Sequence, residues 1–349
     1  MFESNLKELK LKKNGFFVEF GATDGVSGSN TFLLEKEFMK SIKSINNKHD
    51  LIVLHLYDEI EKKIIIIFNK IDLISNKKIL LIAGRPSHGP GDHEFRAGSL
   101  LLEKCLDQLP GITAEVHDMG WPKSDDVFKG ADAILVYADG GGRHPAMRPE
   151  RVKLINGLIA KGAGVGCAHY GVEVPAGDTG KTMQDWIGGY YEHKFSVNPM
   201  WAPDYQKFPK HPIANGVKPF KVVDEWYFNM RFRVDGVGKV TPILTAKPGK
   251  DVRDGPYVYP RGPYKHIVEG EGRAETMMWA YERPNGSRGL GFTGGHKHTN
   301  WGNANYRKVV LNGLLWLAKA EVPKGGVQSR ISAEELEEDL DPKGRKKKK

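Results

Sequence analysis

Histidine and carboxylate residues gather in glycine-rich segments that follow three apolar stretches of the sequence. His93 lies in GRPSHGPGDHEF, Asp139 and Arg143 lie in DGGGRHP, and His169 and Glu173 lie in CAHYGVEVP. An imidazole beside a carboxylate can accept and release protons near neutral pH. These segments therefore predict general acid–base chemistry, with His169 as the candidate general base.

Two segments further along the chain extend this set. VVDEWYF places Asp224 and Glu225 before an aromatic pair, and RGLGFTGGHKHTNW carries His296 in a glycine-rich turn. Glu225 or Glu173 is the expected orienting carboxylate of the general base, so the predicted catalytic set is His169, Glu173 and Glu225. The residues predicted to contact a substrate are His93, Asp139, Arg143, Asp224, Trp226, His296 and Trp301.

Two points about this set stay open. His93, His169 and His296 could instead bind a divalent metal ion, although no HExxH pair or other tight ligand spacing supports zinc. The flat faces of Trp226 and Trp301 could stack on a sugar ring, or both rings could pack in the core. The sequence therefore specifies no cofactor beyond this metal alternative.

Strands and helices alternate in the part of the chain that carries these residues. Apolar runs at 79–84, 131–138 and 163–168 predict neighbouring parallel strands, because such strands are covered on both faces of a sheet. Helices are expected over 93–109 and 149–161. The expected fold is α/β, with a doubly wound, mainly parallel sheet flanked by helices, in which ligands bind at the carboxyl ends of the strands.

Cys167 and His169 both lie where the third strand should turn into a helix. A nucleophile at such an elbow needs small residues two positions before and after it. Val165 and His169 occupy those positions around Cys167, whereas Cys167 and Gly171 occupy them around His169. We therefore expect His169 at the elbow and Cys167 buried in the strand.

Four ordered segments resemble the ThuA-like (trehalose-utilisation) family over about residues 78–320: KILLIAGRPSHGPGDHEF, GAGVGCAHYGVEVP, HPIANGVKPFKVVDEWYF and RGLGFTGGHKHTNWGNANYRKVVLNGLLW. The resemblance implies the fold of class I glutamine amidotransferases, with histidine replacing their cysteine, in agreement with His169 at the elbow. It also implies a protein that acts on or binds a sugar or keto-sugar. A hydrolase, a lyase or isomerase, and a non-catalytic sugar-binding module all stay open.

Residues 1–77 differ in composition from the rest, because they contain no Arg, Pro or Trp. Residues 15–38 resemble the opening of FkbM-type methyltransferases, which implies binding of S-adenosylmethionine. A complete cofactor-binding sheet needs more than about 100 residues, so we expect a poorly integrated fragment that binds nothing. A remnant methyltransferase is the remote alternative. The matching residues are Glu19, Gly21, Asp24 and Gly25.

The net charge of +9 is spread thinly along the chain, apart from the terminal Lys346 to Lys349. No groove-reading motif accompanies it, so no nucleic-acid partner is expected. No apolar run of about 18 residues and no apolar leader are visible, so a cytoplasmic protein without membrane contact is expected. A homo-oligomer stays open. The domain is expected to cover 78–321, followed by a disordered, charged tail over 322–349, with a short capped helix beginning at Ser332.

Overall fold

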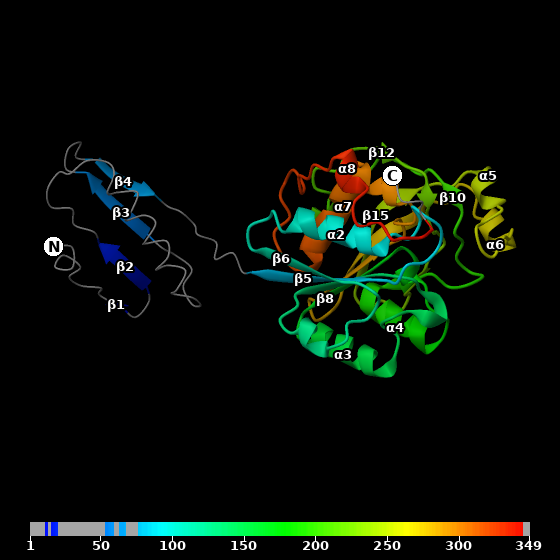
Figure 1. Cartoon of the computed structure of the whole chain (residues 1–349), viewed down its shortest axis with the longest axis horizontal. Helices are drawn as coiled ribbons and strands as arrows, with labels where there is room; N and C mark the ends of the chain where they lie inside the picture. Colours follow the sequence, from blue (N-terminus) through cyan, green and yellow to red (C-terminus); the bar gives the residue numbers. More distant parts are fainter. Residues whose placement is uncertain (1–10, 13–14, 20–52, 59–62, 68–75, 345–349) are drawn as a thin grey trace. The chain divides into compact units, whose positions relative to one another are not determined.

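The computed structural model describes residues 11–12, 15–19, 53–58, 63–67 and 76–344 (Figure 1). The chain divides into two compact units, Met1–Ser75 and Asn76–Lys349. The division lies close to the change in composition.

The first unit contains a four-stranded sheet in the order β1-β2-β3-β4. β2 and β3 run parallel, and the other neighbours are antiparallel. β4 covers an isoleucine-rich run of the sequence. Most of the FkbM-like segment, residues 20–38, lies outside the described residues. The strands are β1 (Leu11–Lys12), β2 (Gly15–Glu19), β3 (Val53–Asp58) and β4 (Lys63–Ile67).

The second unit is built on a seven-stranded sheet in the order β15-β16-β17-β8-β7-β5-β6. Every neighbouring pair from β17 to β6 is parallel, and β16 alone in this sheet runs opposite to its two neighbours. The strands are β5 (Lys77–Ala83), β6 (Ile112–His117), β7 (Ala133–Tyr137), β8 (Gly164–Ala168), β15 (Lys239–Ala246), β16 (Glu275–Glu282) and β17 (Arg288–Phe292).

Helices cover both faces of this sheet (Figure 1). α2 (Phe95–Leu106) and α7 (Ala304–Leu317) lie on one face, and α3 (Pro149–Ala160) and α4 (Asp178–Ile187) lie on the other. Every residue of β7 and β8 is buried, as near-continuous apolar strands between two helical layers require. The predicted α/β class and the adjacency of β5, β7 and β8 are confirmed.

The C-terminal segment differs from the expected disordered tail. Residues 322–344 pack on the second unit, with Val327 fully buried and Asp341 nearly so. The short helix α8 (Ala333–Leu336) has the predicted capping box between Ser332 and Glu335. Charge-rich composition misled the prediction because a few apolar residues, Val322, Val327, Ile331 and Leu336, are enough to pack the segment on the core, and ion pairs such as Lys104–Glu335 at 2.6 Å add to this.

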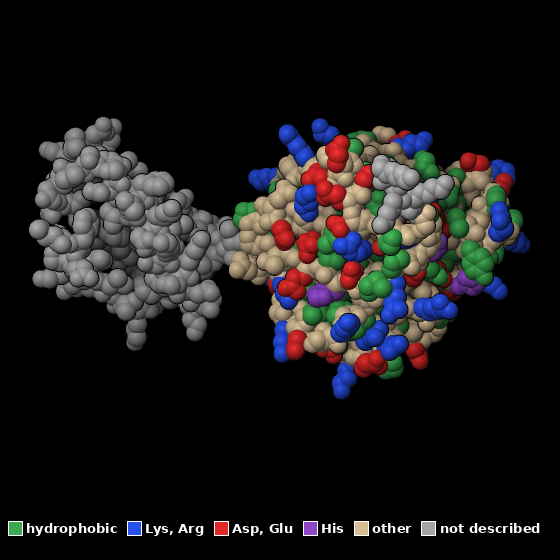
Figure 2. Space-filling model, in the orientation of Figure 1, with side chains coloured by type: hydrophobic (Ala, Val, Ile, Leu, Met, Phe, Trp, Pro, Cys, Tyr) green, Lys and Arg blue, Asp and Glu red, His purple; other side chains and the backbone are tan. Residues whose placement is uncertain are grey.

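The surface of the second unit mixes charges of both signs. Figure 2 shows Lys and Arg side chains interspersed with Asp and Glu side chains on the face in view. This mixture matches the even spread of charge along the sequence. Among the helices that the structure describes, none is long and apolar enough to cross a lipid bilayer.

The two units should be separable. The buried residues described for the second unit form their own core, and β5 already has β6 and β7 as neighbours. Deleting residues 1–75 should therefore change the Tm of the remainder by less than about 4 °C, the equivalent of roughly 1 kcal/mol. Differential scanning calorimetry of the full and shortened chains measures this. A much larger drop would show that the first unit stabilises the second.

Candidate functional site

The polar cluster lies at the carboxyl ends of four adjacent strands. His93 follows β5, Asp139 follows β7, His169 follows β8 directly, and His296 follows β17. These strands are neighbours in the order β17-β8-β7-β5. Glu225 comes from the two-residue strand β13 (Asp224–Glu225), which pairs with β10 (Met200–Trp201). Residues from five places in the chain thus meet at the edge where ligands bind in parallel sheets.

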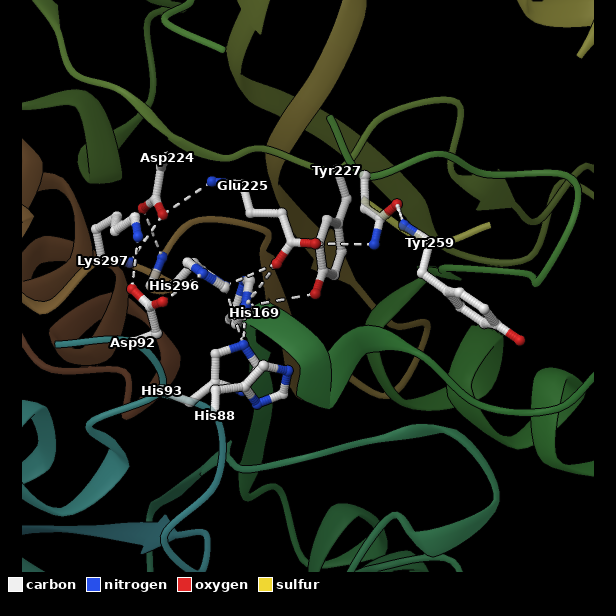
Figure 3. A network of polar contacts seen from close by, with 12 residues as sticks. His88, Asp92, His93, His169, Asp224, Glu225, Tyr227, Tyr259, His296 and Lys297 are labelled. Carbon is white, nitrogen blue, oxygen red and sulfur yellow. Dashed lines mark hydrogen bonds and ion pairs between the residues drawn. The ribbon is translucent and has the colours of Figure 1, made fainter. Parts of the chain in front are cut away.

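Four side chains converge within this cluster, which we call the histidine–glutamate centre: His93, His169, Glu225 and His296 (Figure 3). Nε2 of His93 lies 2.9 Å from Nε2 of His169 and 3.0 Å from Nδ1 of His296. Oε2 of Glu225 lies 2.8 Å from Nδ1 of His296 and 3.5 Å from Nε2 of His169. All four residues are buried.

The backbone at two of these histidines is left-handed. φ is 49° at His93 and 51° at His169, a region that side-chain-bearing residues adopt infrequently. His169 lies at the elbow after β8, as the sequence predicts. A Cβ on Gly171 would lie 2.9 Å from the carbonyl oxygen of Val136, so the elbow requires glycine there. Cys167 is fully buried in the strand, where burial raises its pKa, and the prediction of a buried strand cysteine is confirmed.

The partners of Nδ1 in His93 and His169 determine which ring nitrogen carries the proton. Nδ1 of His93 lies 3.0 Å from a carboxylate oxygen of Asp139, and Nδ1 of His169 lies 3.1 Å from the carbonyl oxygen of Thr293. Both partners are acceptors, so each Nδ1 carries the proton and each Nε2 presents a lone pair. The two lone pairs then face each other across 2.9 Å.

A shared proton does not relieve this contact. Burial, followed by the neighbouring His88 and His296, lowers the pKa of His93, and burial with the other histidines lowers the pKa of His169. Both rings are therefore neutral near pH 7. Moving the proton of His93 to Nε2 would only set Nδ1 against Asp139. A cation between the rings satisfies the lone pairs of both, and a carboxylate or carbonyl behind a ligating histidine is the usual support of a metal site.

The other two members of the centre, Glu225 and His296, are in direct contact and shift each other's pKa. Burial lowers the pKa of His296, but the hydrogen bond and charge of Glu225, helped by Asp92, raise it above its ordinary value overall. Burial raises the pKa of Glu225, and His296 opposes this effect. Nδ2 of Asn198 donates to the other oxygen of Glu225 at 2.8 Å. Oε2 of Glu225 is thus directed at His296 and His169.

Glu173 does not belong to the histidine–glutamate centre, but the charge of Glu225 acts on it. Burial and the nearby Glu225 raise its pKa to about 7. Its backbone is anchored, because its N–H donates to the carbonyl of Tyr170 and its carbonyl accepts from Gly141. A carboxyl group that titrates near neutral pH can donate or accept a proton under physiological conditions.

Asp224 supports the centre from behind and is not free to bind substrate. Its two oxygens accept hydrogen bonds from the backbone N–H groups of Glu225, Gly295 and Lys297 and from the hydroxyl of Tyr306. These contacts hold the turn that carries His296. The predicted substrate contact of Asp224 is therefore corrected to a positioning role.

Two other predicted substrate contacts lie in the core, and a third lies outside the histidine–glutamate centre. Trp226 and Trp301 are fully buried and pack against Phe292 and Tyr306, so the core alternative holds for both. Arg143 lies exposed in the short 3-10 helix Gly141–Arg143, and among the described residues no hydrogen bond or ion pair joins it to the centre. The residue types alone did not show whether these side chains face the core, the solvent or the centre.

Other contacts of the centre escaped sequence analysis. Asn198 stands in SVNPMW, where nothing signals a function. The hydroxyl of Tyr227 lies 3.4 Å from Nε2 of His169, and His88 stacks on His93 with ring centroids 3.6 Å apart. Figure 3 shows these rings around the centre, whereas the ring of Tyr259 points away from it. The histidine-rich turn was the available signal for His88.

The fold and the site thus define a doubly wound α/β protein with a buried histidine–glutamate centre at its strand ends. A family model described as ThuA, trehalose utilisation, matches residues 87–317. The chain belongs to this family. No curated protein matches the sequence.

Solved structures show weaker likeness. A ThuA-like protein from Bacteroides uniformis is 14% identical, with 69% of this chain and 91% of that chain covered and a TM-score of 0.48. A cytoplasmic protein from Salmonella typhimurium is 12% identical, with 69% and 98% covered and a TM-score of 0.40.

Proposed function

We propose that the histidine–glutamate centre binds one divalent transition-metal ion and that the protein uses it to act on a sugar or keto-sugar. The observation that carries the proposal is the pair of facing lone pairs on His93 and His169. Imidazole with one carboxylate is a donor set suited to zinc and its neighbours in the first transition row. The ligand atoms all lie within 4.8 Å of one another.

The size of the centre supports the same proposal. Tetrahedral ligation at about 2.0–2.1 Å separates ligand atoms by roughly 3.3 Å. The contacts described above run from 2.8 to 3.5 Å, so an ion requires shifts of only a few tenths of an ångström for those pairs. His169 is better suited to ligation than to the general-base role expected from sequence. Its low pKa makes it a weak base, and a carbonyl rather than a carboxylate orients it.

Proton transfer is then assigned to Glu173. It is the predicted catalytic carboxylate with a pKa of about 7, and it is not one of the four ligands. A bound transition metal supplies Lewis acidity that polarises a carbonyl or hydroxyl oxygen. His88, exposed above His93, and the partly exposed Asp139 offer polar contacts for substrate hydroxyl groups. The sugar class rests on the family description.

The experiment is a turnover assay on a panel of disaccharides and their keto derivatives. The protein is first stripped of metal with a chelator and then reloaded with Zn²⁺, Mn²⁺ or Co²⁺. Activity that disappears on stripping and returns with one of these ions supports the proposal. Sugar binding without turnover, unchanged by the chelator, would instead favour the non-catalytic binding module.

Glu173 gives a pH prediction for the metal-free protein. Its folded-state pKa of about 7 lies above the ordinary 4.5, so the stability it contributes is present at low pH and is lost as pH rises towards 7. Glu173→Gln removes this titration. The variant should therefore gain about 1–3 kcal/mol of unfolding free energy relative to wild type between pH 5 and pH 8. Urea unfolding at both pH values measures the difference, and a constant difference would contradict the raised pKa.

A further inference from the structure

A lysine near the C-terminus contacts the loop that carries His93. Nζ of Lys343 donates to the carbonyl oxygens of Asp92 at 2.5 Å and His93 at 3.0 Å. It also lies 3.7 Å from a carboxylate oxygen of Glu94 and 3.6 Å from one of Asp341. Its side chain is only 7% exposed. A buried ammonium group is costly unless such partners surround it, so this placement is specific.

The residues around Lys343 are tied to the same loop. The backbone N–H of Asp341 donates to Oε2 of Glu94 at 2.8 Å, and the other oxygen of Glu94 accepts from Gly91 at 2.9 Å. Arg96 forms an ion pair with Asp339 at 3.0 Å. Residues 339–344, which we call the C-terminal strap, are thus bound to the loop through both main-chain and side-chain contacts.

The loop beneath the strap orients two members of the histidine–glutamate centre. His93 is itself a member, and its left-handed backbone needs support from its surroundings. The carboxylate of Asp92 lies 3.5 Å from Nε2 of His296 and 2.6 Å from Nζ of Lys297. The strap therefore contacts the main chain at one ligand and at the residue behind another.

We propose that Lys343 is a positioning residue for the metal centre, acting through the carbonyl groups of Asp92 and His93. This inference rests on the proposed metal-binding function. Without the ammonium, two carbonyl oxygens lose their donor and the buried carboxylate of Glu94 loses a nearby positive charge. The loop then relaxes away from the geometry that aims His93 and Asp92. Support residues behind metal ligands typically change affinity by about 10–100-fold.

The test compares Lys343→Met and Lys343→Gln in the full chain with wild type. Lys343→Gln keeps a donor for the carbonyl groups but removes the charge, so its effect should be intermediate. Lys324→Met is the matched control, because Lys324 is an exposed lysine of the same C-terminal segment. Zn²⁺ titration of each metal-free protein by calorimetry should show affinity falling about 10-fold or more in Lys343→Met and unchanged in the control.

Amide hydrogen exchange of residues 89–94 in the metal-free proteins is the second readout. Lys343→Met should accelerate exchange there while helices far from the loop keep their protection. The inference is overturned if wild type binds zinc and Lys343→Met shows the same zinc affinity and the same rate of exchange as wild type. If wild type binds no zinc, the proposed function fails and the exchange alone decides: faster exchange supports the strap, and unchanged exchange overturns it.

Discussion

Replacing His169 by alanine should abolish stoichiometric zinc binding and reduce turnover to the level of the metal-stripped protein, while the protein stays folded. Nε2 of His169 faces both Nε2 of His93 and Oε2 of Glu225, so no other side chain of the centre can replace it. Zinc affinity by calorimetry and turnover after reloading measure the effect, and circular dichroism verifies folding.

The matched control for this variant is His144→Ala. His144 is also a buried histidine with a lowered pKa, and its Nε2 contacts the carbonyl of Gly171 at 2.9 Å. It does not belong to the group of potential ligands. Both variants should lose stability, but only His169→Ala should lose zinc. Loss of stability with unaltered zinc binding and turnover in His169→Ala would show that the ring is merely packed.

Glu225→Gln should weaken zinc binding by about 100-fold with little change in shape. A four-ligand zinc site is worth about 10–16 kcal/mol, so one ligand accounts for roughly 3 kcal/mol. Glutamine keeps the size of the side chain but removes the negative charge beside His296. The pKa of His296 should consequently fall, because Glu225 supplies the largest of the effects that raise it. Zinc titration and the NMR titration of the ring measure both outcomes.

Glu275→Gln serves as the control for Glu225→Gln. Glu275 is likewise a buried carboxylate, and it pairs with Arg253 at 2.8 Å and with Arg273 at 2.9 Å. Its replacement should reduce stability without affecting zinc affinity. Equal zinc affinity in the two variants would remove Glu225 from the ligand set.

The central strands, and the edge of the sheet where the loops after them meet, were predictable because the sequence signals for them are local. Continuous apolar runs at β5, β7 and β8 indicate burial on both faces, and parallel strands bring their following loops to one edge. His169 was placed at the elbow by a steric rule that involves only Cys167 and Gly171. Such features depend on residues close together in sequence.

Features that depend on distant contacts were not predictable. Trp226 and Trp301 carry flat rings in either environment, and only packing against Phe292 and Tyr306 shows that they belong to the core. Glu225 was found from its residue type, but the two-residue strand that aims it is too short for any periodic signal. Lys343 was assigned to a disordered tail because its partners lie about 250 positions earlier.

X-ray absorption at the zinc edge tests the central claim most directly, because it reports the atoms around a bound ion. The metal-free full-length protein is loaded with one equivalent of Zn²⁺. The account predicts a first shell of three imidazole nitrogens and one carboxylate oxygen at about 2.0–2.2 Å, and loss of one nitrogen or of the ion itself in His169→Ala. A shell without imidazole scattering, or one that is identical in His169→Ala, would contradict it.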